Sequence, residues 1–176
     1  METRGKKSAL VIIDMLNDFV LAGSPLEVLN TRKILPALKA RLLSARREGT
    51  PVIYICDAHG RNDREFKLWP AHAVEGSKGA QVVDELKPLA GEKVVMKRTY
   101  SGFYRTGLSQ VLRRLGVEDL TLTGCVTNIC ILYIAYEAVV RRYTVKVPRD
   151  SVAGLNEEDD ACAFSQMERV LGVEVI

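Results

Sequence analysis

ALVIID, residues 9–14, is the stretch that decides the fold class of this chain. It is apolar without alternation, rich in Val and Ile, and it ends in Asp14. Continuous apolar runs of this length are typical of strands that are buried on both faces, as in a parallel sheet. Comparable runs follow at residues 51–57, 93–98, 119–124, 143–147 and 173–176.

Helical signals separate these runs. Asn30 and Asn156 stand at positions that favour a helix start, and Gly49 and Gly116 stand where a helix would stop. Alternation of strands and helices predicts a parallel sheet covered on both sides by right-handed crossovers. We therefore expect the α/β class, as a three-layer α/β/α Rossmann-like fold, with helices over residues 31–48, 106–115, 127–141 and 157–171.

Bulk properties predict one compact domain over residues 1–176. The chain has 176 residues, of which 47% are hydrophobic and 27% charged, with a net charge of +3. Lys and Arg are spread along the sequence, which argues against nucleic-acid binding, and no apolar run is long enough for a membrane span. We expect a cytoplasmic protein without a cleaved leader, whose four cysteines, lacking any CxxC pair, are reduced.

Reactive side chains follow the ends of the first four predicted strands. Asp14, Asp57 and Lys97 close the first three, and the fourth leads through a turn to Cys130. Ligands of open parallel sheets bind at the carboxyl ends of the strands. Taken singly, each residue has a plainer interpretation as a turn aspartate, a solvated lysine or a packed cysteine. Their convergence favours an active site.

The only two histidines, His59 and His72, both follow the second predicted strand. Asp57 and His59 are one residue apart, so an extended chain presents both on the same face. With His72 they could form a three-ligand metal site that leaves positions open for water or substrate. A hydrogen-bonded surface pair is the alternative. If both imidazoles bind metal, no histidine remains to deprotonate a cysteine, and Asp14 is the available base.

Among the four cysteines, Cys130 has the position expected of a nucleophile. It falls in the first turn of the helix predicted from about residue 127, which Thr127 or Asn128 could cap. Unpaired backbone N–H groups and the positive end of the helix dipole favour a thiolate there. The other three cysteines have no such position.

The ordered motifs VIIDMLNDF, DAH, WPAH, KRTYSGF and TGCVTNIC resemble the isochorismatase-like cysteine hydrolase superfamily, in its nicotinamidase-like branch. The resemblance implies a six-stranded sheet of order 3-2-1-4-5-6 and a catalytic triad of Asp14, Lys97 and Cys130. It also implies a cis peptide between Cys125 and Val126, with the amides of Val126 and Cys130 forming an oxyanion hole.

The same resemblance implies a metal centre and an aromatic pocket. The metal ligands would be Asp57, His59 and His72, holding a divalent ion, with zinc expected first and iron or manganese as alternatives. Pocket aromatics would be Phe19 and Trp69 on either side of a substrate ring, with help from Tyr100 and Phe103. The last two could instead be core residues. In place of a further metal-site histidine, the loop offers only Asp63, Arg64 and Glu65.

We therefore expect a cysteine-dependent amidohydrolase, most simply a nicotinamidase that converts nicotinamide and water to nicotinate and ammonia. An N-carbamoylsarcosine amidase or a ureidoacrylate-type amidohydrolase on the same triad is the alternative, and a non-catalytic binding protein a remote one. The expected partner is a small carboxamide substrate, and the family resemblance suggests a homo-oligomer.

Overall fold

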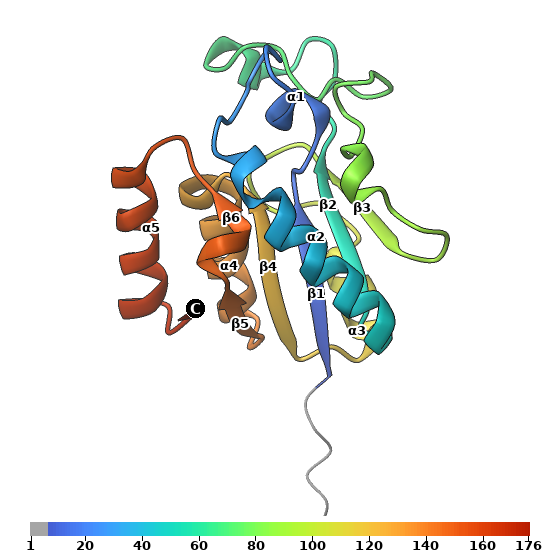
Figure 1. The fold of residues 1–176 in the computed structure, drawn as a ribbon, viewed down its shortest axis with the longest axis vertical. Helices are drawn as coiled ribbons and strands as arrows, with labels where there is room; N and C mark the ends of the chain where they lie inside the picture. Colours follow the sequence, from blue (N-terminus) through green and yellow to red (C-terminus); the bar gives the residue numbers. More distant parts are fainter. Residues whose placement is uncertain (1–6) are drawn as a thin grey trace, which may run out of the picture.

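A computed structural model describes residues 7–176 of the chain. A parallel sheet runs through its centre in the order β3-β2-β1-β4-β5-β7, with β6 paired to β4 (Figure 1). Its strands are β1 (Ser8–Ile13), β2 (Val52–Asp57), β3 (Lys93–Lys97), β4 (Asp119–Cys125), β5 (Thr144–Val147), β6 (Val152–Ala153) and β7 (Glu174–Val175). The predicted class and strand order are confirmed, since β7 is the sixth apolar run.

The short strand β6 is the one addition to the expected six. β5 pairs only with residues 119–121 of β4, so the carboxyl half of β4 has an open edge. β6 pairs there with Gly124 and Cys125. Two residues are too few to form a recognisable apolar run, which is why the sequence did not predict this strand.

Helices cover both faces of the sheet (Figure 1). The α-helices are α1 (Asn17–Val20), α2 (Thr31–Glu48), α3 (Leu108–Leu115), α4 (Leu132–Val140) and α5 (Glu157–Arg169). A five-residue π-helix (Thr127–Ile131) precedes α4, and short 3-10 turns lie at Arg64–Lys67, Asp84–Leu86 and Arg149–Ser151.

Three of the four predicted helix-boundary residues act as expected. Gly49 and Gly116 adopt left-handed φ angles of 68° and 65° after α2 and α3. The side chain of Asn156 accepts a hydrogen bond of 2.8 Å from the Asp159 N–H at the start of α5. Asn30 precedes α2 but makes no side-chain cap; its φ and ψ angles of −76° and −12° are already helical, and its amide donates to the carbonyl of Gly154, 3.4 Å away.

The core consists of two apolar layers, one on each face of the sheet. Leu10 and Ile12 of β1 point into the layer under α2, and Val11 and Ile13 point into the layer under α3, α4 and α5. Both faces of β1 are therefore buried, which explains why its sequence is apolar without alternation.

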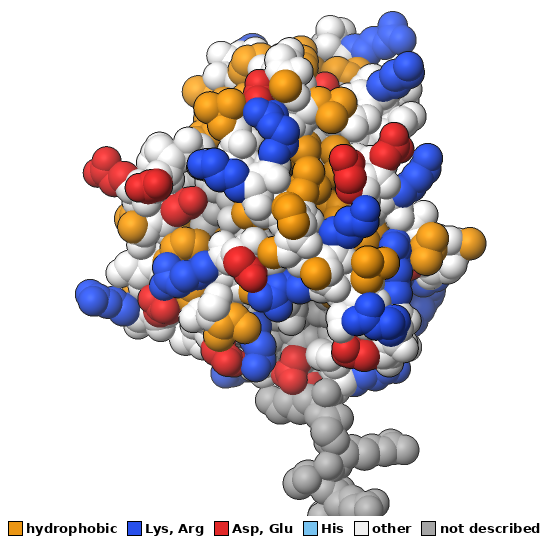
Figure 2. Space-filling model, viewed as in Figure 1, with side chains coloured by type: hydrophobic (Ala, Val, Ile, Leu, Met, Phe, Trp, Pro, Cys, Tyr) orange, Lys and Arg blue, Asp and Glu red, His pale blue; other side chains and the backbone are white. Residues whose placement is uncertain are grey.

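The carboxyl ends of the strands meet at the upper edge of the sheet in Figure 1, beneath α1 and the long segment of residues 58–79. Acidic and basic side chains are interspersed over the face seen in Figure 2. Within residues 7–176, no helix combines the length and the apolar character that crossing a bilayer requires.

Candidate active site

Asp14 follows β1 and is buried, with 1% of its surface exposed. Its φ angle of 51° is uncommon for a residue other than glycine, so the surrounding structure must hold it there. The backbone N–H of Asp57, at the end of the neighbouring strand β2, donates a 2.8 Å hydrogen bond to Asp14 Oδ1. The pairing of β1 with β2 thus fixes the direction of this carboxylate.

Lys97 ends β3 and connects the reactive groups. Its Nζ lies 2.8 Å from Asp14 Oδ2 and 3.4 Å from Cys130 Sγ, and it also donates to Asp57 Oδ1. Asp57 and Lys97 are register partners in the sheet. The two carboxylates and the thiol from three different elements therefore converge on one buried ammonium.

The turn after β4 brings the chain unusually close to β1. Gly124 has a φ of 109°, and a Cβ at this position would lie 2.0 Å from the carbonyl oxygen of Ile13. The next peptide bond, Cys125–Val126, is cis. Cys125 is buried, and its Sγ donates to the backbone carbonyl of Asp14 at 3.2 Å, so its thiol points at the backbone.

Cys130 lies in a π-helical turn and not in the first turn of an α-helix. The Ile131 N–H donates to the carbonyl of Val126, five residues earlier, at 3.2 Å. Val126 occupies the N-cap position and makes no side-chain cap. The prediction that Thr127 or Asn128 caps this helix is therefore wrong. The wider turn places the Cys130 thiol beside Lys97.

The pKa values of the three reactive groups are all raised, each by a different balance of burial and neighbouring charge. Burial and the charge of Asp57 raise the pKa of Asp14 to about 6, against the opposing effect of Lys97. Burial disfavours the charged form of Lys97, but the two carboxylates outweigh it and raise the Lys97 pKa well above its ordinary value. Burial also raises the pKa of the Cys130 thiol, which Lys97 offsets only in part. Cys130 is thus a thiol that needs a base.

Asp57, His59 and His72 form a second group, which shares Asp57 with the cluster around Lys97. Their potential ligand atoms lie within 4.8 Å of one another, and all three side chains are buried. His72 Nδ1 lies 2.7 Å from the carbonyl of Pro70, which accepts its proton and leaves Nε2 free. His59 Nδ1 lies 3.1 Å from Asp63 Oδ2 in the same way.

These residues fit a divalent cation. His59 Nε2 is buried without a hydrogen-bond partner and lies 3.7 Å from Asp57 Oδ2. Ligands of a tetrahedral zinc ion, each about 2.1 Å from the metal, lie roughly 3.4 Å apart. Burial lowers the pKa of His72, which keeps its imidazole neutral and able to ligate. Burial of His59 is outweighed by Asp57 and Asp63, which raise its pKa to about 9, so a bound metal would have to displace that proton. The carboxylates of Asp14 and Asp57 also exceed the single ammonium, so a cation would offset buried negative charge.

Glu65 is a nearby acid to which the sequence assigned no role. Its Oε1 lies 3.9 Å from His72 Nε2, and the side chain lines the same cavity as Cys130. Its signal in the sequence was its place in the loop that offers Asp63, Arg64 and Glu65 instead of a further metal-site histidine. It offers a further oxygen donor beside the two histidines.

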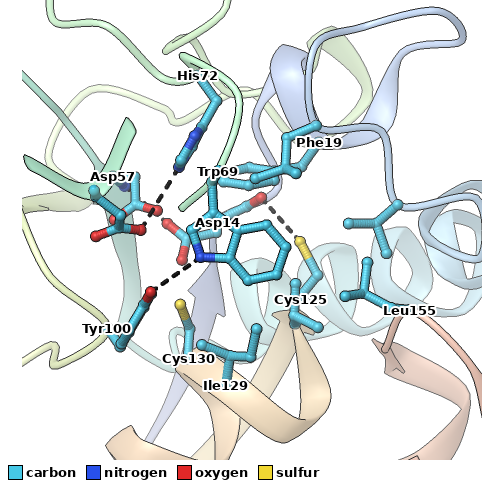
Figure 3. Close-up of a pocket in the computed structure, with 14 residues that line it drawn as sticks. Asp14, Phe19, Asp57, Trp69, His72, Tyr100, Cys125, Ile129, Cys130 and Leu155 are labelled. Carbon is cyan, nitrogen blue, oxygen red and sulfur yellow. Dashed lines mark hydrogen bonds and ion pairs between the residues drawn. The ribbon is translucent and has the colours of Figure 1, made fainter. Parts of the chain in front are cut away.

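A cavity of about 410 Å³, measured with the solvent at its mouth, opens between the two groups (Figure 3). Phe19, Trp69 and Tyr100 line it, and Trp69 Nε1–H donates to the Tyr100 hydroxyl at 3.0 Å. Phe103 is not among the lining residues, because its ring is buried in the core beside Tyr143.

Aliphatic side chains form much of the remaining wall, and of these the sequence identified only Val126, for its backbone amide. They are Leu26, Val28, Val126, Ile129 and Leu155. Their contribution depends on loops meeting in three dimensions, which no local motif encodes. Within residues 7–176, the charged residues that line the cavity are Asp14, Asp57 and Glu65, and no Lys or Arg of this part of the chain lines it.

Fold and site together define a parallel α/β protein with a buried thiol, carboxylate and ammonium at the strand ends. Residues 8–176 match the model of the Isochorismatase domain family. The chain therefore belongs to the isochorismatase family of hydrolases.

Three relatives illustrate the range of this family. The uncharacterized isochorismatase family protein YaaI of Bacillus subtilis (strain 168) is 30% identical over 167 residues, 95% of this chain and 92% of that protein. The N-carbamoylsarcosine amidase of Thermoplasma acidophilum is 34% identical with a TM-score of 0.88, covering 96% of this chain and 95% of its own. The pyrazinamidase of Pyrococcus horikoshii, solved in complex with zinc, is 28% identical with a TM-score of 0.91, covering 97% and 98%.

Proposed function

We propose that this protein is a cysteine-dependent amidohydrolase for a small uncharged aromatic carboxamide, with nicotinamide as the leading substrate. The observation that carries the proposal is the shared cavity. Its lining includes the Cys130 thiol and Asp14, the proposed metal ligands Asp57 and His72, and the aromatic side chains of Phe19, Trp69 and Tyr100. A flat ring with a carboxamide arm suits that arrangement.

Asp14 is the proposed base and Cys130 the nucleophile. Asp14 accepts the thiol proton as Cys130 Sγ bonds to the amide carbon, and the carbonyl electrons move to oxygen. The amides of Val126 and Cys130 stabilise this oxyanion. Asp14 then gives the proton to the departing nitrogen, ammonia leaves, and a thioester remains. Asp14 next takes a proton from water, which attacks the thioester and releases the carboxylic acid and the thiol.

Lys97 is the proposed source of positive charge in the cluster. Its ammonium stabilises the Asp14 carboxylate, and it contacts Cys130 Sγ as negative charge develops there. The side chain is not itself a proton donor in this scheme, since its pKa lies well above its ordinary value.

Asp57, His59 and His72 would hold a divalent metal, with zinc as the proposed ion. Such an ion, when bound, supplies a Lewis acid that a pyridine-type nitrogen can approach. Phe19 and Trp69 would flank the substrate ring, and Tyr100 would fix the indole of Trp69 through their hydrogen bond. Asp57 thus serves both groups, with Oδ1 towards Lys97 and Oδ2 towards His59.

A ureide substrate is the second candidate, because the N-carbamoylsarcosine amidase is 34% identical over nearly the whole chain. N-carbamoylsarcosine and ureidoacrylate carry a carboxylate. Among the described residues, three acidic side chains and no Lys or Arg line the cavity. The proposed metal ion would be the one cation that faces it, and a substrate carboxylate would be desolvated beside three acids, which favours the uncharged carboxamide.

The test is ammonia release from nicotinamide, pyrazinamide and N-carbamoylsarcosine by the zinc-loaded protein. We expect turnover of the two ring carboxamides and little of the ureide. Preference for N-carbamoylsarcosine would assign the second candidate. Turnover of none, together with alkylation of Cys130 no faster than that of the buried Cys56 and Cys125, would favour a binding protein that only retains the fold.

A further inference from the structure

We infer that Asp18 is a positioning residue that holds both metal-binding histidines in place. The inference rests on the proposed metal site of Asp57, His59 and His72. Asp18 belongs to the VIIDMLNDF motif, in which only Asp14 and Phe19 have a proposed role. Its own carboxylate lies outside the group of side chains that can ligate one ion and does not line the cavity.

A single backbone residue, Ala73, connects Asp18 to the two histidines. Asp18 Oδ2 accepts a 2.8 Å hydrogen bond from the Ala73 N–H, and Ala73 directly follows His72 in the chain. The Ala73 carbonyl in turn accepts a 3.0 Å hydrogen bond from the His59 N–H. The backbone of each histidine is therefore one bond or one hydrogen bond away from a residue that Asp18 holds.

Ala73 needs an external partner to keep this geometry. It is fully buried and has a φ of 44°, which is sparsely populated for alanine. A buried N–H without a partner is destabilising, because it loses its hydrogen bonds to water and gains none in the protein. The Asp18 carboxylate both satisfies that N–H and offsets the strain of the conformation that follows His72.

The absence of a side chain at Gly79 leaves the space that the Asp18 carboxylate occupies when it binds the Ala73 N–H. A Cβ on Gly79 would lie 2.0 Å from Asp18 Oδ2 and 2.3 Å from its Cγ, so only glycine leaves room for the carboxylate. The Asp18 N–H donates to the Gly79 carbonyl at 3.1 Å, which fixes α1 against this segment. The ring of Phe19, the next residue, packs edge-on against His72 with centroids 5.3 Å apart.

Two substitutions of Asp18 separate the hydrogen bond from the charge. Asp18→Ala leaves the Ala73 N–H without its acceptor, and we expect the zinc affinity to fall by about tenfold to a hundredfold, as for loss of an outer-shell partner. Asp18→Asn removes the charge but retains an acceptor oxygen, and we expect it to restore most of that affinity.

Gly79→Ala tests the same contact with Asp18 intact. The new methyl group must displace the carboxylate from Ala73, so we expect a loss of zinc affinity close to that of Asp18→Ala. Gly60→Ala is the matched control. Gly60 directly follows His59, yet a Cβ there meets nothing within 4 Å, and we expect unchanged affinity.

The experiment is competition for Zn²⁺ between each protein and a colorimetric chelator, with far-UV circular dichroism of the metal-free proteins to establish that each is folded. Wild-type affinity in both Asp18→Ala and Gly79→Ala would overturn the inference. So would an equal loss in Asp18→Asn and Asp18→Ala, which would assign the effect to charge. If Asp18→Ala does not fold, Asp18→Asn and Gly79→Ala decide. A wild-type protein that binds no zinc would instead refute the proposed metal site on which the inference rests.

Discussion

The two halves of the site are built by different means. Asp14, Lys97 and Cys130 come from the ends of β1 and β3 and from the turn after β4, so the register of the sheet places them. In the metal group, Asp57 also ends a strand, whereas His72 lies far along the 58–79 segment and depends on loop contacts. The sheet thus positions the nucleophile, whereas contacts of the 58–79 segment position His72.

Substitution of Cys130 by alanine should give the largest effect, because it removes the nucleophile but no element of the scaffold. We expect ammonia release from nicotinamide to fall on the order of a thousandfold or more, with zinc affinity retained. Cys162→Ala, at an exposed cysteine on α5, is the control and should keep full activity. Substantial turnover by Cys130→Ala would remove this residue as the nucleophile.

Substitution of His72 by alanine should separate the two halves. Loss of a ligand should lower zinc affinity by about a hundredfold or more, since even an outer-shell partner contributes 10–100-fold. The cluster around Lys97 makes no hydrogen bond to His72, so we expect Cys130 to react with iodoacetamide at nearly the wild-type rate in metal-free protein. A large change in that rate would show that the sheet alone does not place the thiol.

Adding a methyl group at Gly124 should disrupt the half of the active site that the sheet positions. Gly124→Ala puts its Cβ against the backbone carbonyl of Ile13, which cannot rotate away as a side chain could. We expect the free energy of unfolding to fall by about 1–3 kcal/mol, measured by urea denaturation. Gly60→Ala, with open space around it, should change that free energy little. Equal stability of both variants would contradict the close approach of β1 and β4.

The smallest expected effect concerns the hydrogen bond between Trp69, in the 58–79 segment, and Tyr100. Tyr100→Phe removes the acceptor for Trp69 Nε1–H, a contact worth about 1 kcal/mol, so the KM for nicotinamide should rise roughly fivefold with little change in kcat. Tyr104→Phe, at an exposed ring nearby in sequence, should leave KM unchanged. A fall in kcat alone would place Tyr100 in the chemistry and not in binding.

The sequence was most informative where structure follows from local pattern. Apolar runs without alternation identified the buried strands, and the residue that closes each strand was sufficient to predict that Asp14, Asp57 and Lys97 meet. Strand pairing then brings these residues together, because neighbouring parallel strands end at the same edge of the sheet.

Other features were not predictable in this way. One is the π-helical turn at Cys130, because a hydrogen bond between residues five apart leaves no distinctive sequence period. The core position of Phe103 is another, because motif order cannot tell a ring under Arg141 from a ring in the cavity. The link from Asp18 to Ala73 spans 55 positions and passes over Gly79, so only the folded chain reveals it.

Formation of a bond between Cys130 and a substrate carbonyl tests the central claim most directly. Pyridine-3-carbaldehyde has the ring of nicotinamide but no leaving group, so a thiol that adds to its carbonyl forms a thiohemiacetal that cannot be hydrolysed. With the aldehyde carbon labelled with ¹³C, we predict a tetrahedral-carbon NMR signal in the wild-type protein that is absent from Cys130→Ala. Binding of the aldehyde without that signal, or the same signal in Cys130→Ala, would contradict the account.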